Sequence, residues 1–263
     1  MSFYGNNDKW WHALLTGENP ILPFRNLRHI FGLLPSNPRC KFCHAPFEGP
    51  ASTVMQLIGK RRSRISPDLC LQCEAFARNI PGGAEIELTM LFSDVRGSTE
   101  LAEQMSPGDF GKLVNRFYVT ATEVFVHSHG WVDRLAGDQV IGLYIPGFAG
   151  DEHARTAVQA AVELMEQMGH DGEGDPLLPI GTGVHTDIAY VGAVGVEEGA
   201  TDVTVLGDAA NTTARLCSSA AAGEILVAEG TASSAGLPIS NLEKRELDLK
   251  GKREKVTVYV LAE

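Results

Sequence analysis

Residues 87–103 read ELTMLFSDVRGSTELAE, and residues 130–145 read GWVDRLAGDQVIGLYI. Around the start of the first stretch, apolar side chains recur at every second position, which is the period of a half-buried β-strand. These apolar positions are Ile86, Leu88, Met90 and Phe92. Asp94 follows them, so we expect its carboxylate to lie where the strand ends.

A turn and the start of a helix follow Asp94 directly. The segment contains a glycine and a hydroxyl residue that can cap a helix before Glu100 and Leu101. Backbone N–H groups at such a helix start attract phosphate. We therefore expect a phosphate-binding turn made of Val95, Arg96, Gly97, Ser98 and Thr99.

The second stretch predicts two strands joined by a tight turn at Ala136 and Gly137. That turn brings Asp138 to the edge of the sheet. Two strand ends would then each present one carboxylate, Asp94 and Asp138. Hard oxygen ligands of this kind hold Mg²⁺, which takes further ligands from substrate phosphates.

These residues resemble the class III nucleotidyl cyclases, which convert a nucleoside triphosphate into a 3′,5′-cyclic monophosphate and pyrophosphate. The resemblance runs from about residue 85 to residue 261. FSDVRGST is similar to the first metal motif of that family, and DRLAGD to the second. VLGDAANTTARL contains the family signature N-x-x-x-R at Asn211 and Arg215, and GVHTDIAYVG is a fourth motif in the right order.

The resemblance implies a role for each matched residue. Asp94 and Asp138 would hold two Mg²⁺ or Mn²⁺ ions per site. Asn211 would orient the ribose, and Arg215 would stabilise the phosphate in the transition state. In the family, the asparagine and arginine serve the site that carries the partner's aspartates, so the resemblance implies a homodimer with two composite sites.

Two further positions bear on the choice of base. Adenylate-specific members carry lysine four residues before the second aspartate, where this chain has Arg134, and aspartate or threonine seven residues before the asparagine, where it has Thr204. A donor and a hydroxyl favour adenine, although arginine also donates to the guanine carbonyl. Lys250, in LDLKGK, resembles the family lysine that meets the terminal phosphate; an exposed lysine at a strand end is the alternative.

The expected function is therefore that of an adenylate cyclase acting on ATP. A guanylate cyclase is one alternative. Another is a catalytically silent, nucleotide-binding or dimerising regulator, although none of the key aspartate, asparagine and arginine residues is missing. In a third alternative the cysteine-containing segment is the working part and the cyclase fold is accessory.

Charge and composition limit the class of protein. Residues 1–80 carry 10 basic against 5 acidic residues, whereas the remainder carries 12 against 28, within a total net charge of −11. An acidic catalytic half argues against nucleic acid as a substrate, because nothing there would neutralise a phosphate backbone. With no long apolar run and no leader pattern, we expect a cytoplasmic protein without an integral membrane segment.

Two C-x-x-C pairs, 26 residues apart, predict a four-thiolate metal site in the N-terminal part. Zinc is the first expectation, and iron is the alternative. Haem attachment at CKFCH is disfavoured, because it would leave the second pair unexplained. The expected ligands are Cys40, Cys43, Cys70 and Cys73, while Cys217 fits a small core residue better than a nucleophile.

Two other N-terminal features allow more than one reading. The basic run from Lys60 to Arg64 is expected to be a solvated loop, with an anionic partner as the alternative, including the acidic half of this chain. The segment from Asp8 to Leu34 is rich in tryptophan and aliphatic residues. We expect it to pack on the rest of the protein or across a dimer; attachment to a membrane surface is less favoured, and DNA binding still less.

The punctuation at Pro81, Gly82 and Gly83 predicts a boundary between residues 1–82, a helical and four-cysteine module, and residues 83–263, the catalytic domain. In the latter we expect helices over residues 107–125 and 152–168, with Ser106 as the cap of the first. Residues 180–194 are expected to form a hairpin. The result is an α+β, ferredoxin-like fold with a mostly antiparallel sheet.

Overall fold

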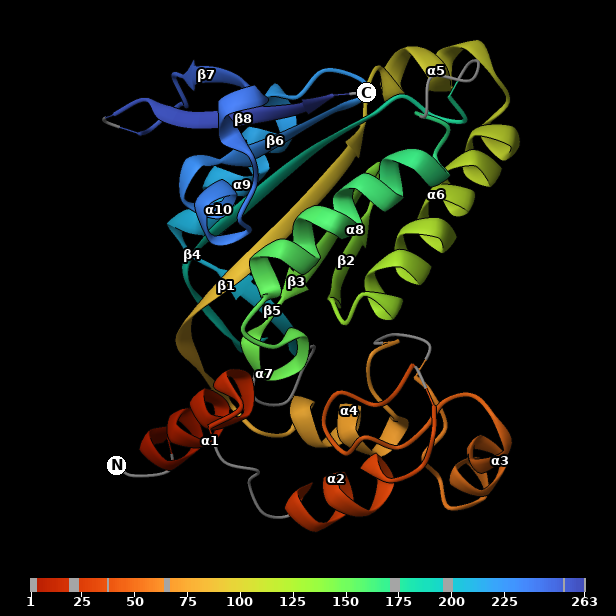
Figure 1. Cartoon of the computed structure of the whole chain (residues 1–263). Coiled ribbons are helices and arrows are strands. Elements are labelled where there is room, and N and C mark those ends of the chain that lie inside the picture. Colours follow the sequence, from red (N-terminus) through yellow and green to blue (C-terminus); the bar gives the residue numbers. More distant parts are fainter. Residues whose placement is uncertain are drawn as a thin grey trace.

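The structure, a computed structural model, describes residues 4–18, 24–36, 38–63, 67–170, 176–195, 201–252 and 254–262. The N-terminal helices α1 to α4 gather at one end of the molecule, and the sheet with its other helices forms the rest (Figure 1). The helices are α1 (Tyr4–Thr16), α2 (Phe24–Gly32), α3 (Pro50–Leu57), α4 (Leu71–Arg78), α5 (Ser98–Gln104), α6 (Pro107–His127), α7 (Pro146–Ala149), α8 (His153–Gln167), α9 (Asp208–Ser219) and α10 (Glu229–Ser234). The strands are β1 (Gly82–Val95), β2 (Trp131–Ala136), β3 (Gln139–Tyr144), β4 (Ile180–Gly195), β5 (Thr201–Leu206), β6 (Glu224–Ala228), β7 (Glu243–Leu247) and β8 (Val256–Ala262), and a 3₁₀ turn spans Ile239–Asn241.

The strands form one mixed sheet in the order β2-β3-β1-β4-β6-β8-β7, with β5 paired to β4. The pairing of β4 with β6 is parallel, and the other pairings are antiparallel. The prediction of an α+β fold with a mostly antiparallel sheet is confirmed. Its two central strands, β1 and β4, pair from Gly82 opposite Ala193 to Val95 opposite Ile180.

The predicted hairpin over residues 180–194 is wrong. The segment is a single strand, β4, because β1 offers a partner along nearly all of it, from Ile180 to Ala193. The glycines of β4 serve close packing instead of a turn: a Cβ on Gly183 would lie 2.4 Å from the backbone nitrogen of Cys217 in α9. Cys217 is fully buried there, and burial raises the pKa of its thiol to about 12, which suits a core residue.

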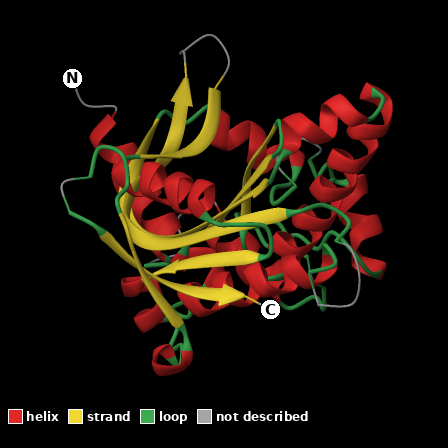
Figure 2. Cartoon of the chain, turned by 90° about the horizontal axis from the view of Figure 1, so that it is seen from above, coloured by secondary structure: helices red, strands yellow, loops and turns green. Residues whose placement is uncertain are grey.

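Helices cover both faces of the sheet (Figure 2). On one face, Leu91 and Val95 of β1 join a core cluster with α6, α8 and α10. On the other, the predicted alternating side chains Ile86, Leu88, Met90 and Phe92 join a cluster that includes residues of α9 and α1. Helix α6 begins as expected: Pro107 is its first residue, and the hydroxyl of Ser106 accepts a hydrogen bond from the Asp109 N–H at 3.2 Å.

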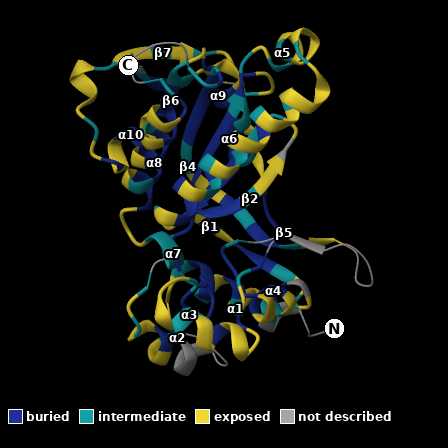
Figure 3. Cartoon of the chain, turned by 90° about the vertical axis from the view of Figure 1, so that its right-hand side faces the viewer, coloured by how far each residue is buried: buried dark blue, intermediate teal, exposed yellow. Residues whose placement is uncertain are grey.

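The N-terminal helix α1 packs on β1, which confirms that this segment packs on the rest of the protein. Trp11, Leu14 and Leu15 are buried in the same cluster as the cysteines and the apolar residues of β1. Figure 3 shows buried segments both along β1 and among the N-terminal helices. The burial of three such side chains stabilises the joint by several kcal/mol, at about 1.5–3 kcal/mol for each.

The basic run is only partly the solvated loop that we expected: Arg61 is exposed, but Lys60 is buried. Lys60 is only 7% exposed, and its ammonium lies 3.8 Å from the sulfur of Cys43 and 3.1 Å from the amide oxygen of Gln72. The Lys60 ammonium lies beside the cysteines because thiols, and still more thiolates, accept hydrogen bonds from an ammonium. Arg64 lies outside the described residues.

Across the described part of the chain, no helix has the length and apolar character needed to cross a membrane.

Candidate active site

Asp94 and Asp138 lie side by side at one end of the sheet. Asp94 is the next-to-last residue of β1 and pairs in register with Gln139, the residue that follows Asp138. The turn between β2 and β3 is tight because Gly137 adopts a left-handed conformation, with φ of 66°. The backbone closes this corner, since the Val95 N–H donates to the Asp138 carbonyl at 3.0 Å.

Each carboxylate has one oxygen engaged by a neighbouring side chain. Asp94 Oδ2 accepts from the Arg96 guanidinium at 2.9 Å, and Asp138 Oδ2 accepts a short hydrogen bond from the Ser98 hydroxyl. The other oxygen of Asp94, Oδ1, is buried, and within the described ranges it has no hydrogen-bond partner. A buried carboxylate oxygen without a donor is suited to a cation, so the pair fits Mg²⁺ or Mn²⁺.

The pKa of Asp94 is consistent with a divalent cation at this carboxylate pair. Burial raises the pKa of Asp94, the negative charge of Asp138 raises it further, and Arg96 lowers it. Two like charges held together in a half-buried corner therefore destabilise the charged form of Asp94. A divalent cation between them would remove this repulsion.

Two of the five backbone N–H groups in the predicted phosphate-binding turn already have hydrogen-bond partners. The N–H groups of Val95 and Arg96 already donate to the carbonyls of Asp138 and Pro179, at 3.0 and 2.6 Å. These two backbone donors are thus already engaged, and phosphate binding by the five residues of the turn stays a prediction. Gly97, Ser98 and Thr99 stand at the start of α5, where N–H groups lack partners within the helix.

Asn211 and Arg215 lie one turn apart on α9, as the spacing predicts. Asn211 is exposed and Arg215 is half-buried. The loop after β7 closes over this helix: Lys252 forms an ion pair with Asp208 in the first turn, and the Arg215 guanidinium lies against Gly251. Lys250 is exposed in the same loop. The loop thus brings Lys252 to the first turn of α9 and Gly251 to the Arg215 guanidinium.

The two base-specifying candidates lie on β2 and β5, which are not paired in the sheet but contact each other. Thr204 of β5 is buried, and its hydroxyl donates to Asp133 Oδ2 of β2 at 3.2 Å; Arg134, the next residue, is exposed. Asp133 was not among the predicted site residues, nor were Asp208 and Lys252. Asp208 could have been found from its place at the start of a helix, but no local pattern points to Asp133.

Within one chain these groups do not form a single cluster. Among the described residues, no hydrogen bond or ion pair joins Asp94 or Asp138 to Asn211 or Arg215. Arg96 instead connects Asp94 to the far end of α9, where it donates to the Ser218 carbonyl at 3.3 Å. Asn211 lies seven residues away, about 10 Å along the helix axis.

The four cysteines of the N-terminal module come together. Their sulfur atoms all lie within 4.8 Å of one another and all four residues are buried; Cys43 Sγ and Cys70 Sγ are 3.8 Å apart. Zn–S bonds of about 2.3 Å at tetrahedral angles separate two sulfurs by about 3.8 Å. A disulfide requires about 2.05 Å. The arrangement fits a tetrahedral metal site.

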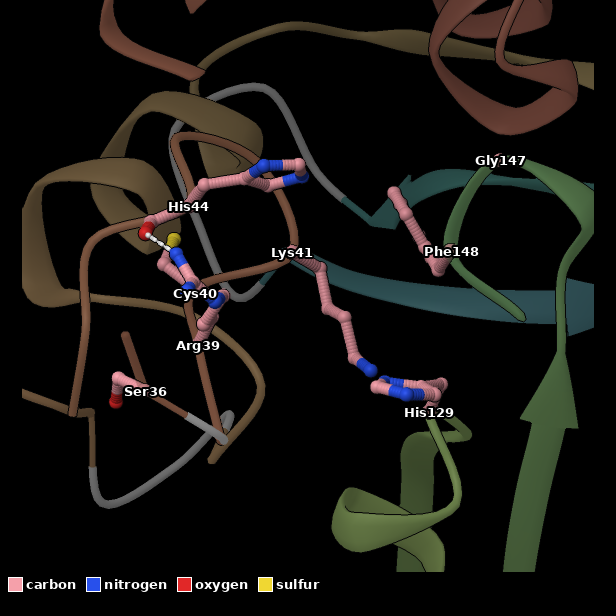
Figure 4. A pocket seen from close by; sticks show the side chains of 8 residues that line it. All are labelled: Ser36, Arg39, Cys40, Lys41, His44, His129, Gly147 and Phe148. Carbon is pink, nitrogen blue, oxygen red and sulfur yellow. Dashed lines mark hydrogen bonds between the residues drawn. The ribbon is translucent and has the colours of Figure 1, made fainter. Parts of the chain in front are cut away.

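A hollow of about 360 Å³ separates the first cysteine loop from the catalytic part. It is lined by Ser36, Arg39, Cys40, Lys41, His44, His129, Gly147 and Phe148. The Lys41 side chain crosses it, with its ammonium next to the His129 ring just before β2 (Figure 4). Burial and the Lys41 charge lower the pKa of His129. The loop that follows Cys40 thus reaches the start of β2.

The repulsion at the carboxylate pair predicts a stability effect. Because the pKa of Asp94 is raised in the folded state, the folded protein holds this proton more tightly than the unfolded chain. Without metal, stability should therefore fall as pH rises from the ordinary value of 3.8 through the raised one. Asp94→Asn should remove this loss and raise the melting temperature of metal-free protein at pH 7 by about 2–4 °C, or about 1 kcal/mol.

Calorimetry without Mn²⁺ measures how far the repulsion lowers the melting temperature. Calorimetry with Mn²⁺ measures how far a bound cation raises it. Mn²⁺ should raise the melting temperature of the wild type but not that of Asp94→Asn. A metal-free variant that melts below the wild type at pH 7 would contradict the assigned repulsion.

Comparison with known proteins agrees with this geometry. Residues 84–263 match the model of the family described as "Adenylate and Guanylate cyclase catalytic domain". An adenylate cyclase of Anabaena cylindrica is 28% identical over 181 residues, and the terminal-differentiation-specific adenylate cyclase of Dictyostelium discoideum is 30% identical over 181 residues. Each match covers 65% of this chain, but only 36% and 8% of those relatives, so this chain spans about a third of their length or less.

Two solved structures are similar in fold and in sequence. The guanylyl cyclase Cya2 superposes with a TM-score of 0.63 at 27% identity, covering 68% of this chain and 93% of that one. The adenylyl cyclase CyaB from P. aeruginosa superposes with a TM-score of 0.59 at 27% identity, covering 69% and 96%. The matched region contains the two aspartates, the α9 signature and both base-specifying candidates.

Proposed function

This chain belongs to the adenylate and guanylate cyclase catalytic-domain family, and we propose that it is an adenylate cyclase that converts ATP to 3′,5′-cyclic AMP and pyrophosphate. The observation that carries the proposal is the carboxylate pair. Asp94 and Asp138 meet at the sheet end, and one buried oxygen of Asp94 has no partner among the described residues. Relatives with adenylate cyclase names support the same reading.

In the proposed reaction the ribose 3′ oxygen attacks the α-phosphorus in line, and pyrophosphate leaves. Mg²⁺ or Mn²⁺ held by Asp94 and Asp138 would polarise the attacking hydroxyl and neutralise the phosphate charge. Arg96 and Ser98 keep the two carboxylates oriented through one oxygen of each. The N–H groups of Gly97, Ser98 and Thr99 receive phosphate oxygens at the start of α5.

Asn211 and Arg215 supply the remaining groups from a second copy of the chain. Asn211 binds the ribose, and the Arg215 guanidinium stabilises charge that develops on the phosphates. Lys250 meets the terminal phosphate, and the neighbouring ion pair of Lys252 with Asp208 holds the loop in place. The separation of α9 from the aspartates within one chain supports a homodimer with two composite sites.

Arg134 and Thr204 select the base in this proposal. The exposed Arg134 guanidinium offers a donor, which suits the ring nitrogens of adenine, and the Thr204 hydroxyl, whose proton goes to Asp133, offers an acceptor for the amino group of adenine. A guanylate cyclase is the second candidate, because arginine also donates to the guanine carbonyl and the guanylyl cyclase Cya2 is similar in fold. Steady-state assays of the purified chain with ATP and GTP, each with Mg²⁺ and with Mn²⁺, decide between them. No turnover under any of the four conditions would favour a silent regulator.

We also propose that residues 1–82 form a structural zinc module attached to the catalytic domain, residues 83–263. The sulfur geometry fits zinc, and four thiolates with a divalent ion carry a net charge of about −2. Lys60, at 3.8 Å from Cys43 Sγ, lies where it offsets part of that charge.

Removal of one thiolate should unfold the module. Structural zinc contributes folding free energy on the order of 10 kcal/mol, so Cys70→Ser should lose its metal and the protection of residues 40–73 from proteolysis. Elemental analysis should find about one zinc per wild-type chain. The matched control is Cys217→Ser, a buried cysteine outside the cluster, which should keep the zinc. An iron absorption spectrum, or no metal in the wild type, would rule out zinc.

A further inference from the structure

Asp68 belongs to the loop of the second cysteine pair, yet its carboxylate binds the catalytic sheet. The residue is only 1% exposed, and Oδ2 accepts a hydrogen bond from the Val132 N–H of β2 at 2.6 Å. Its own carbonyl accepts from the Lys41 N–H at 2.9 Å. Lys41 follows the ligand Cys40, and Asp68 precedes Cys70 by two residues. Asp68 therefore joins the two halves of the cysteine module through its backbone carbonyl, and joins them to β2 through its carboxylate.

Strand β2 is irregular at the residue that Asp68 binds. Val132 pairs with Gly142 and Arg134 pairs with Ile141, so Asp133 is an extra residue opposite β3. A bulge of this kind redirects the side chains that follow it. Here these are Asp133, which accepts from the Thr204 hydroxyl, and Arg134, the other candidate for base recognition. The Asp68 bond thus holds the backbone immediately before both residues.

The cysteine module also contacts β5, the strand that carries the other base-specifying candidate. Helix α4, which contains Cys73, packs against β5, which contains Thr204. The metal aspartates lie elsewhere: Asp138 is six residues beyond Val132, past the β2–β3 turn. A displacement at Val132 should therefore move the base-recognition residues more than the carboxylate pair.

We propose that Asp68 is a positioning residue for base recognition, holding the β2 bulge so that Arg134 and Thr204 address the same base. The proposal rests on the proposed nucleotidyl cyclase function, which it extends from the catalytic domain to the cysteine module. In this proposal the cysteine module influences nucleotide selection through the hydrogen bond between Asp68 and the Val132 N–H of β2. Loss of the bond would leave the Val132 N–H buried without an acceptor, so the bulge would rearrange.

The test uses three variants of the full chain with metal bound. Asp68→Leu replaces the carboxylate with a larger apolar side chain and removes the acceptor, Asp68→Ala removes it and leaves a cavity, and Asp68→Asn keeps an acceptor oxygen. The Leu and Ala variants should raise the KM for ATP about five- to tenfold and change the ATP-to-GTP preference, with kcat within about twofold. The Asn variant should behave like the wild type. Asp151→Leu, at an exposed turn before α8, is the matched control and should change nothing.

Two further measurements test the proposal without catalytic turnover. Dissociation constants for 3′-deoxy-ATP and 3′-deoxy-GTP, which lack the attacking hydroxyl, should shift with the KM values. Amide hydrogen exchange of residues 131–136 should become faster in the Leu and Ala variants only. If the wild type lacks activity while these shifts occur, the proposed function fails and the positioning role stands. Unchanged exchange or unchanged base preference in metal-loaded Asp68→Leu, or an Asn variant that behaves like Leu, would overturn the inference.

Discussion

Asp94→Ala and Asp138→Ala should each lower cyclase turnover by about a thousandfold or more, because each removes a charge that would hold the catalytic cations. Neither side chain lies in the apolar core: Asp94 is half-buried at the end of β1, and Asp138 follows a turn. The fold, and with it the proposed dimer, should therefore persist in both variants. Steady-state assays with Mg²⁺ and Mn²⁺, together with circular dichroism and light scattering, measure activity and fold separately.

Asp151→Ala provides the matched control, since it makes the same substitution at an exposed aspartate of the turn before α8. It should retain wild-type turnover. Near-normal turnover in either Asp94→Ala or Asp138→Ala would remove the basis for the two-metal assignment.

Mixing two inactive variants should restore activity if the sites are shared between chains. Asp94→Ala lacks a metal ligand and Arg215→Ala lacks the phosphate-binding guanidinium, so each homodimer has two broken sites. In a mixed dimer one site carries both substitutions and the other carries neither. With free exchange of subunits, an equimolar mixture should recover up to about a quarter of wild-type activity, because half of the dimers are mixed and each has one intact site.

The control for this experiment is a mixture of Asp94→Ala with Asp138→Ala. Both residues belong to the same half of the site, so every site in that mixed dimer lacks one carboxylate and no recovery is expected. Subunit exchange is checked independently by energy transfer between labelled chains. If subunits exchange but Asp94→Ala with Arg215→Ala stays inactive, each chain builds its own site.

The local patterns of the chain were sufficient for the elements that carry the carboxylates and for α6. The alternation up to Phe92, the left-handed glycine at position 137 and the Ser106 cap each depend on residues within a few positions. Backbone sterics and hydrogen bonds of that range act in the same way wherever the segment lies. The grouping of the four cysteines was also predictable, because their spacing points to a shared metal site.

Contacts between distant segments decided the rest. Residues 180–195 form one strand because β1, about a hundred positions earlier, pairs with nearly all of it. The N–H groups of Val95 and Arg96 are already engaged because carbonyls of Asp138 and Pro179 accept them. Sequence patterns carry no information about such partners, since pairing depends on which backbone groups the completed fold brings within bonding distance.

The same limit applies to the residues that connect the two parts of the molecule. Thr204 and Asp133 are separated by 71 positions, and Asp68 and Val132 by 64. A lone aspartate that follows a proline, such as Asp68, suggests a solvated loop residue, as the basic run near Lys60 also did. The identities and spacing of residues along the chain determined the family and the corner where the two aspartates meet. Only the packing of the cysteine module against β2 and β5 gave Asp68 a buried hydrogen bond, because burial is a property of the assembled core and not of the local sequence.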